Sequence, residues 1–142
     1  MDQSTFKIIE HTADIGIEVI GARLADLFIH AAEAMFSLIA SRKTGVSTRR
    51  TARTIPIHLE AADSEELFIA WLNELLSLSA VKNVIFSDFR IDTIDDTHLK
   101  GSVRGEPVAR YRITTEIKAA TFHELALEHR GSSWKAKVIF DV

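Results

Sequence analysis

The sequence of 142 residues contains no cysteine and only two prolines. The absence of cysteine excludes disulfide bonds, zinc sites built from thiolates and cysteine nucleophiles. No apolar run approaches the roughly 20 residues that a membrane-spanning helix requires. The first residues also lack the basic-then-apolar order of a secretion signal. We therefore expect a cytoplasmic protein with no membrane association.

The usual sequence signatures of enzymes are missing as well. There is no phosphate-binding P-loop, no glycine-rich dinucleotide motif and no nucleophile elbow. His123 begins a segment like the zinc-protease helix motif, but Leu127 stands where the second histidine belongs. Asp92 begins a segment like a calcium-binding loop, but Thr97 and Val103 replace the required glycine and glutamate. No catalytic residue is predicted.

The charge balance argues against tight binding of nucleic acid. The formal net charge is −3 and the isoelectric point is about 6.1, whereas proteins that neutralise many phosphates usually carry a basic excess. One segment, Arg42–Arg53, holds five basic residues and no acidic one. It is either a solvated loop or a patch for RNA or an acidic partner.

The spacing of apolar residues predicts the secondary structure. Helical spacing occupies residues 24–39 and 63–79, and in the second segment Asp63 can cap the helix while Glu66 reaches back. The region 41–54 has no apolar period and is predicted to be a loop. Alternation predicts strands at 6–9, 15–20, 55–59, 84–91 with a bulge near Ser87-Asp88, 99–103, 113–119, 122–129 and 134–141.

Two helices and six or more strands predict a single α+β domain over residues 1–142, with the helices packed on a largely antiparallel sheet. Pro56 cannot donate a ladder hydrogen bond, so its strand is expected at an edge. Trp71 and Trp134 lie on apolar stripes and are expected in the core. Asn73, on the polar side of its helix, is expected either in solvent or against a partner.

One group of oxygen donors remains as a candidate site. Asp14 ends a polar break between two apolar strands, and Asp141 lies one residue from the end of the last strand, beside Val142. Carboxylate and main-chain oxygens suit calcium or magnesium rather than zinc. The alternatives are that Asp14 only closes a turn and that Asp141 is a solvated end residue.

Four segments resemble, in the same order along the chain, the sequence signatures of the archease family. They are His11-Thr12-Ala13-Asp14-Ile15-Gly16-Ile17, Trp71-Leu72-Asn73-Glu74-Leu75-Leu76, Ile117-Lys118-Ala119-Ala120-Thr121-Phe122-His123, and Trp134-Lys135-Ala136-Lys137-Val138-Ile139-Phe140-Asp141-Val142. The resemblance implies an accessory protein rather than an enzyme. Archeases act with the GTP-dependent RNA ligase that joins a 3′-phosphate end to a 5′-hydroxyl end in tRNA splicing and RNA repair. They promote guanylylation of the ligase and its multiple turnover, so contact with RNA is expected only through the ligase.

The resemblance also implies which residues act. Archeases bind a divalent metal, calcium or magnesium here, and the matching ligands are Asp14, Asp141 and the main chain of Val142. Candidates for the functional surface, taken from the matching segments, are His11, Lys118 and His123. The segment Pro107–Ile113 departs from the family pattern, which usually has an aspartate-rich turn there, so the surface that meets the ligase is expected to differ.

Two other functions remain open from the residues alone. A metal-dependent hydrolase could use the same two aspartates to activate a water molecule. A chaperone-like or RNA-binding module could use the basic segment Arg42–Arg53.

Overall fold

The computed structural model describes residues 6–10, 14–44 and 53–142. Its two helices are α1 (Leu24–Ile39) and α2 (Ser64–Lys82), and a short 3₁₀ helix, η2, covers Val108–Arg110. None of the helices in these ranges is long and apolar enough to cross a bilayer. The strands are β1 (Phe6–Glu10), β2 (Asp14–Gly21), β3 (Ala40–Arg42), β4 (Arg53–Glu60), β5 (Val84–Ile94), β6 (His98–Pro107), β7 (Tyr111–Ile113), β8 (Ala119–Arg130) and β9 (Ser133–Asp141).

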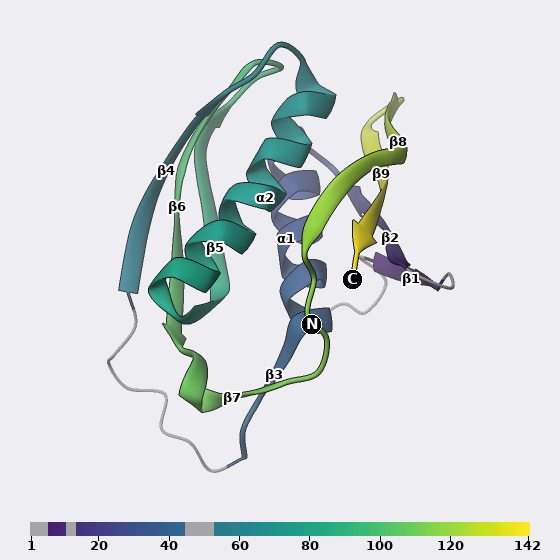
Figure 1. Cartoon of the computed structure of the whole chain (residues 1–142). Coiled ribbons are helices and arrows are strands. Elements are labelled where there is room, and N and C mark those ends of the chain that lie inside the picture. Colours follow the sequence, from purple (N-terminus) through teal and green to yellow (C-terminus); the bar gives the residue numbers. More distant parts are fainter. Residues whose placement is uncertain (1–5, 11–13, 45–52) are drawn as a thin grey trace.

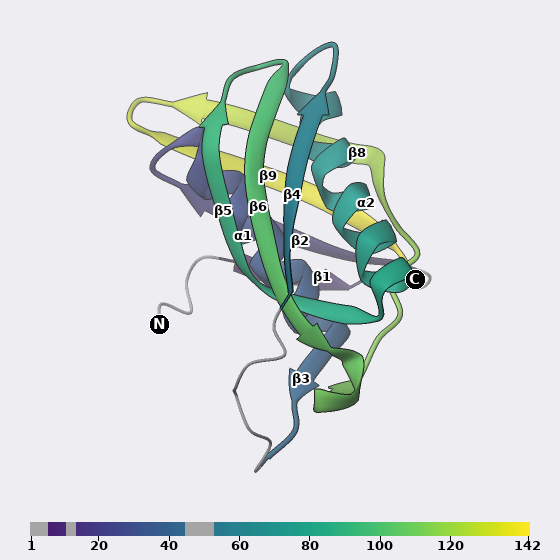
Figure 2. The same ribbon diagram turned by 90° about the vertical axis from the view of Figure 1, so that its left-hand side faces the viewer.

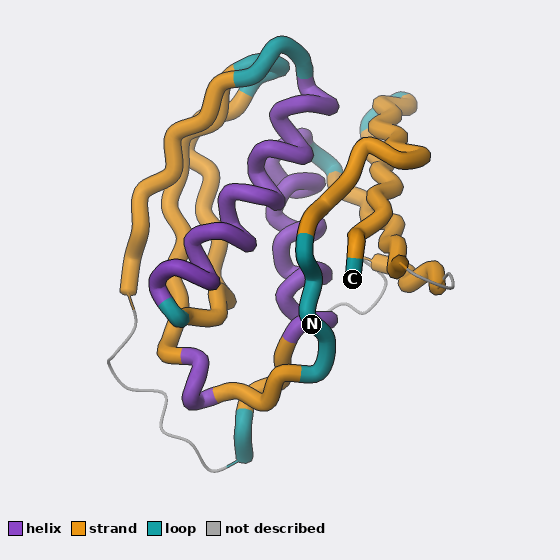
Figure 3. The backbone as a smooth tube through the Cα atoms, viewed as in Figure 1, coloured by secondary structure: helices purple, strands orange, loops and turns teal. Residues whose placement is uncertain are grey.

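The strands form three antiparallel sheets, and the helices lie between the two larger ones (Figures 1 and 3). The four-stranded sheet has the order β1-β2-β9-β8, and the three-stranded sheet has the order β4-β6-β5. Strands β3 and β7 form a separate pair. The strands of the two larger sheets run in different directions (Figure 2). The predicted α+β fold class is confirmed. The strands form separate sheets on two sides of the helices rather than one sheet.

The core lies where α1 and α2 meet the inner faces of the two sheets. Trp71 is fully buried, as its apolar stripe predicts. Its indole Nε1 donates a hydrogen bond of 2.9 Å to the main-chain oxygen of Phe28 on α1. The Phe28 and Phe68 rings meet edge to face with centroids 5.1 Å apart. Trp134 is only partly buried, and its ring stacks on His129 at 4.3 Å.

The start of α2 follows the sequence signal. The Asp63 side chain accepts a hydrogen bond of 2.8 Å from the Glu66 N–H, which is the predicted cap. Glu66 reaches back to the N–H of Ala62 at 2.8 Å. The helix continues to Lys82 rather than ending near Ser79, and it stops at Asn83, whose left-handed backbone (φ 58°) cannot continue a helix.

The observed strands agree with the predicted ones at some positions and differ at others. Pro56 does lie on an edge strand, since β4 is at the edge of its sheet, and β5 does shift register between Phe86 and Asp88. The strand predicted at 113–119 is wrong, because residues 114–118 pair with no strand. The loop predicted at 41–54 is wrong at both of its ends, which belong to β3 and β4; residues 45–52 lie outside the described ranges.

Candidate functional site

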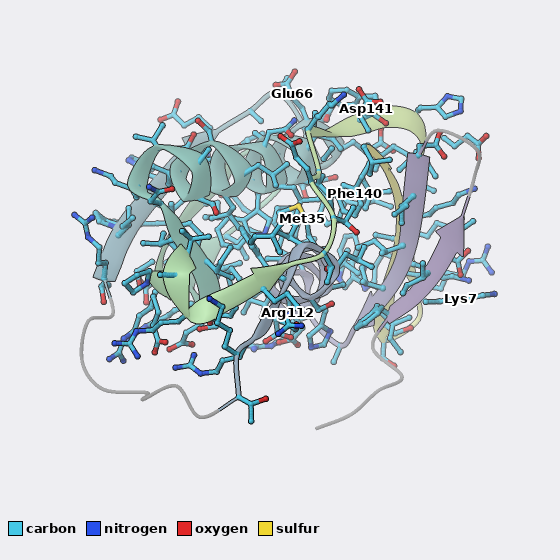
Figure 4. The ribbon with its side chains drawn as sticks, turned by 60° about the horizontal axis from the view of Figure 1, so that its bottom comes forward. Lys7, Met35, Glu66, Arg112, Phe140 and Asp141 are labelled. Carbon is cyan, nitrogen blue, oxygen red and sulfur yellow. The ribbon has the colours of Figure 1, made fainter. Side chains whose placement is uncertain are left out.

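The two aspartates singled out from the sequence occupy directly opposite positions on β2 and β9. Alternation along the strands decides where their side chains go. Ile17 and Val138 also form an opposite pair, and both are fully buried on the inner face. Asp14 and Asp141 are therefore both on the outer face, which is turned away from the helices. Figure 4 shows Phe140 directed into the interior near Met35, with Asp141 at the margin of the molecule.

A third strand completes the surroundings of Asp141. Ala119 on β8 lies opposite Asp141, on the side away from β2. The N–H of Lys118 donates a hydrogen bond of 2.8 Å to the main-chain oxygen of Asp141. Val142 is partly buried and packs against the core. The main chain at 141–142 is thus held beside the two carboxylates.

The charge arrangement at this position is unusual for a strand pair. Two carboxylates directly opposite each other repel and destabilise the pair. Farther along the same face, Glu18 lies opposite Lys137, so that position joins opposite charges. One oxygen of Asp14, Oδ1, is shielded from solvent. A cation between the aspartates would turn the repulsion into attraction.

The donor set fits a hard divalent cation that keeps part of its water. In the described ranges no three histidine, cysteine, aspartate or glutamate side chains come together as a metal cluster. A cation at Asp14 and Asp141 would therefore need main-chain oxygen, such as that of Val142, and water as further ligands. Magnesium often binds in this way through one or two carboxylates, and calcium accepts mixed carboxylate, carbonyl and water ligands.

The other candidate residues lie at different distances from this pair. Lys118 adjoins it through its main chain, and its side chain is exposed. His123 is exposed, and its Nε2 lies 3.4 Å from a carboxylate oxygen of Glu124 rather than at the aspartates. His11 lies outside the described residues.

His123 belongs to an irregular bulge that the sequence did not indicate. Pairing of β8 with β9 is interrupted between Thr121 and Ala126. Within the gap, Glu124 has a left-handed backbone (φ 54°), which is uncommon for residues other than glycine. Its carboxylate binds Nζ of Lys137 at 2.8 Å. The ring of Phe122 beside it is 58% exposed, although it is apolar.

The divergent segment Pro107–Ile113 forms η2 and β7, and β7 pairs with β3. Arg42, the first residue of the basic stretch, binds Glu106 at 2.6 Å. It also lies 5.7 Å from the centre of the Tyr111 ring. The hydrogen bond with Glu106 raises the pKa of Arg42. Arg42 is therefore engaged within the fold, while Arg49 and Arg50 lie outside the described residues.

The surface of the protein also carries a hollow of about 470 Å³. It lies between α2 and the segment that leads into β8. Asn73, Leu76, Glu116, Lys118 and Ala119 are among its lining residues. The side chain of Asn73 is turned toward β8 and binds the main chain of Ala120. Asn73 is thus bound within the fold, whereas its place on the polar side of the helix predicted contact with solvent or with a partner.

Comparison with known protein families agrees with this architecture. Residues 6–142 match the model of the Archease protein family. The protein archease of Methanosarcina acetivorans is 36% identical, and the match covers 96% of this chain and 95% of that protein. The protein archease of Methanopyrus kandleri is 32% identical, with 94% and 96% covered.

Solved structures agree as well. The solution structure of protein 1598 from Methanobacterium thermoautotrophicum is 31% identical with a TM-score of 0.71, covering 97% of this chain and 99% of that one. The crystal structure of an archease from Thermotoga maritima, described as a possible chaperone, is 27% identical with a TM-score of 0.64, covering 96% of this chain and 96% of that one.

Proposed function

The chain belongs to the archease family, and from this premise we propose that it is a cytoplasmic, non-enzymatic activator of a GTP-dependent RNA ligase. The ligase joins RNA ends that carry a 3′-phosphate, or a 2′,3′-cyclic phosphate, to 5′-hydroxyl ends, as in tRNA splicing and RNA repair. The activator promotes guanylylation of the ligase and its multiple turnover. It meets RNA only through the ligase.

The observation that carries this proposal is the position of Asp14 directly opposite Asp141. Together with the main chain of Val142 they would hold a calcium or magnesium ion. When bound, such an ion supplies a concentrated positive charge that attracts phosphate oxygens. The role of the two aspartates is to hold that charge at a sheet margin, where a partner protein can reach it.

An activator of this kind needs no chemistry of its own. A protein that binds one conformation of its partner preferentially raises the population of that conformation. Here the preferred state is the ligase conformation ready for guanylylation. The pairing of β2 with β9 would keep Asp14 and Asp141 opposite each other while the ligase changes conformation.

The proposal is tested by RNA end joining with limiting ligase from the same organism. We expect the wild-type protein to convert about one round of joining into many, and Asp14→Ala and Asp141→Ala to abolish this effect. The matched control is Glu18→Ala, which removes a carboxylate from the same face of β2 but from a pair with Lys137. A control that fails as completely as the two aspartate variants would contradict the assignment.

Two further measurements separate the parts of the proposal. Titration calorimetry with calcium and with magnesium shows whether the wild type binds either ion and whether Asp14→Ala removes binding. A variant that loses the ion but still activates the ligase would separate activation from metal binding. Release of phosphate from small phosphorylated substrates by the protein alone would instead indicate the metal-dependent hydrolase.

A further inference from the structure

The side chain of Asn73 connects helix α2 to strand β8 through two hydrogen bonds. Its Oδ1 accepts from the N–H of Ala120 at 2.8 Å, and its Nδ2 donates to the oxygen of Ala120 at 3.1 Å. The carboxamide thus occupies both main-chain groups of one residue, as a neighbouring strand would. This arrangement needs both a donor and an acceptor, and the amide of Asn73 supplies them from two separate atoms.

The bonded residue lies in a short ladder between two irregular segments. Near the acidic pair, β8 pairs regularly with β9 only from Ala119 to Thr121. Residues 114–118 before it pair with no strand, and the bulge 122–125 follows it. Ala120 is the middle residue of these three. Asn73 therefore binds the ladder at its centre, between two segments that lack regular strand pairing.

This ladder determines the position of Asp141 from one side. Ala119 lies opposite Asp141, and the N–H of the preceding Lys118 binds the Asp141 main-chain oxygen at 2.8 Å. Asp14 lies opposite Asp141 on the other side. A continuous set of contacts thus leads from α2 through β8 to the main chain that carries the second aspartate.

We infer that Asn73 is a positioning residue for the Asp14–Asp141 cation site. It holds β8 in register against β9 so that the Asp141 carboxylate and the adjacent main chain keep the geometry that a cation requires. This inference rests on the proposed metal site and adds to it a residue that does not touch the ion. Loss of a residue that orients metal ligands from outside typically weakens metal binding roughly 10-fold to 100-fold.

The test compares Asn73→Ala with Trp71→Phe, which removes a different buried hydrogen bond from the same helix, the one to Phe28 on α1. Calcium and magnesium alone are titrated calorimetrically into each protein. We expect roughly 10-fold weaker binding for Asn73→Ala and unchanged binding for Trp71→Phe, although both variants unfold more easily. Asn73→Asp keeps the acceptor for the Ala120 N–H, replaces the donor with a carboxylate oxygen and adds a negative charge, so it provides a second variant if the alanine form does not fold.

A second readout does not depend on metal. Exchange of the Lys118 amide hydrogen, which binds Asp141, should accelerate in Asn73→Ala relative to amides in β2, and should not do so in Trp71→Phe. Unchanged exchange at Lys118 would overturn the inference whatever the metal does. Weaker metal binding in both variants alike would also overturn it, because general loosening would explain the effect. A wild type that binds neither ion, with exchange altered as expected, would overturn the metal site and leave Asn73 as a residue that positions the strand.

Discussion

Asp14 and Asp141 occupy opposite positions on two neighbouring strands, with their side chains on the same outer face. Every other feature of the proposed site depends on this pairing, because it places two carboxylates next to each other. Like charges placed opposite each other across strands destabilise the pair by roughly 0.2–1 kcal/mol. A cation bound between the two carboxylates would offset this cost.

Removing one of these charges should have opposite effects with and without metal. When a chelator has removed divalent metal, Asp141→Asn should raise the midpoint of thermal unfolding by about 1–3 °C, because the repulsion between the two carboxylates is lost. Excess calcium or magnesium should raise the unfolding midpoint of the wild type more than that of the variant, because binding of the ion to the folded state stabilises it. Glu18→Gln removes a carboxylate that lies opposite a lysine rather than an aspartate, so it should not raise the midpoint in either condition. Equal gains on adding either ion for wild type and Asp141→Asn would contradict a site at this pair.

The hydrogen bond between the two helices offers a prediction about the core. Trp71→Phe keeps an aromatic ring in the core but removes the donor to the Phe28 oxygen and leaves part of the indole volume empty. We expect the free energy of unfolding to fall by about 1–3 kcal/mol. Urea unfolding followed by circular dichroism measures it. No change in the unfolding midpoint would mean that this bond does not contribute net stability.

Two glycines should respond to alanine for different reasons. A Cβ added at Gly101 would lie 2.1 Å from the Arg90 main-chain oxygen, so β5 and β6 would have to separate. We expect a loss of roughly 2–3 kcal/mol. Gly131 has open space around it but a left-handed backbone (φ 57°), so alanine there should cost only about 1 kcal/mol. The denaturant midpoints of the two variants test whether Gly101→Ala destabilises the protein more than Gly131→Ala. The reverse result would show that the strands adapt to Gly101→Ala.

The turn between β5 and β6 predicts a dependence on pH. Hydrogen bonds from the N–H groups of Thr97 and His98 lower the pKa of Asp95. A carboxyl whose pKa is lower in the folded state stabilises the protein above its unfolded pKa, about 3.9, and this contribution disappears as the pH falls through the folded pKa. The stability difference between wild type and Asp95→Asn should therefore be present at pH 7 and shrink toward pH 3. Asp96→Asn, in the same turn, is the control, and a difference that grows on acidification would contradict the sign.

The sequence was sufficient for the helices because their signals are local. The apolar stripe of α1 begins and ends where the helix does, and the Asp63 cap marks the start of α2. The β3–β7 pair was missed because neither three-residue strand alternates clearly, and each exists only through its partner. The bulge 122–125 was missed because Glu124 takes a conformation for which glycine or asparagine is the usual signal.

The site was predictable only in part. Carboxylates near two strand ends indicated hard-cation chemistry. Their position directly opposite each other follows from the register of β2 with β9, which no local pattern encodes. The role of Asn73 was hidden for the same reason. A polar residue on a helix looks solvated until the strand beside it is known, and Ala120 is distant in the sequence.

The pairing of β2 with β9 also has a consequence for synthesis. It joins residues 14–21 to residues 133–141, so the two carboxylates come together only after residue 141 has left the ribosome. Until then β2 lacks its central neighbour, and the four-stranded sheet cannot close. A long-range pairing of this kind is expected to form late in folding. The two aspartates would then face each other only in molecules whose four-stranded sheet has closed through β9.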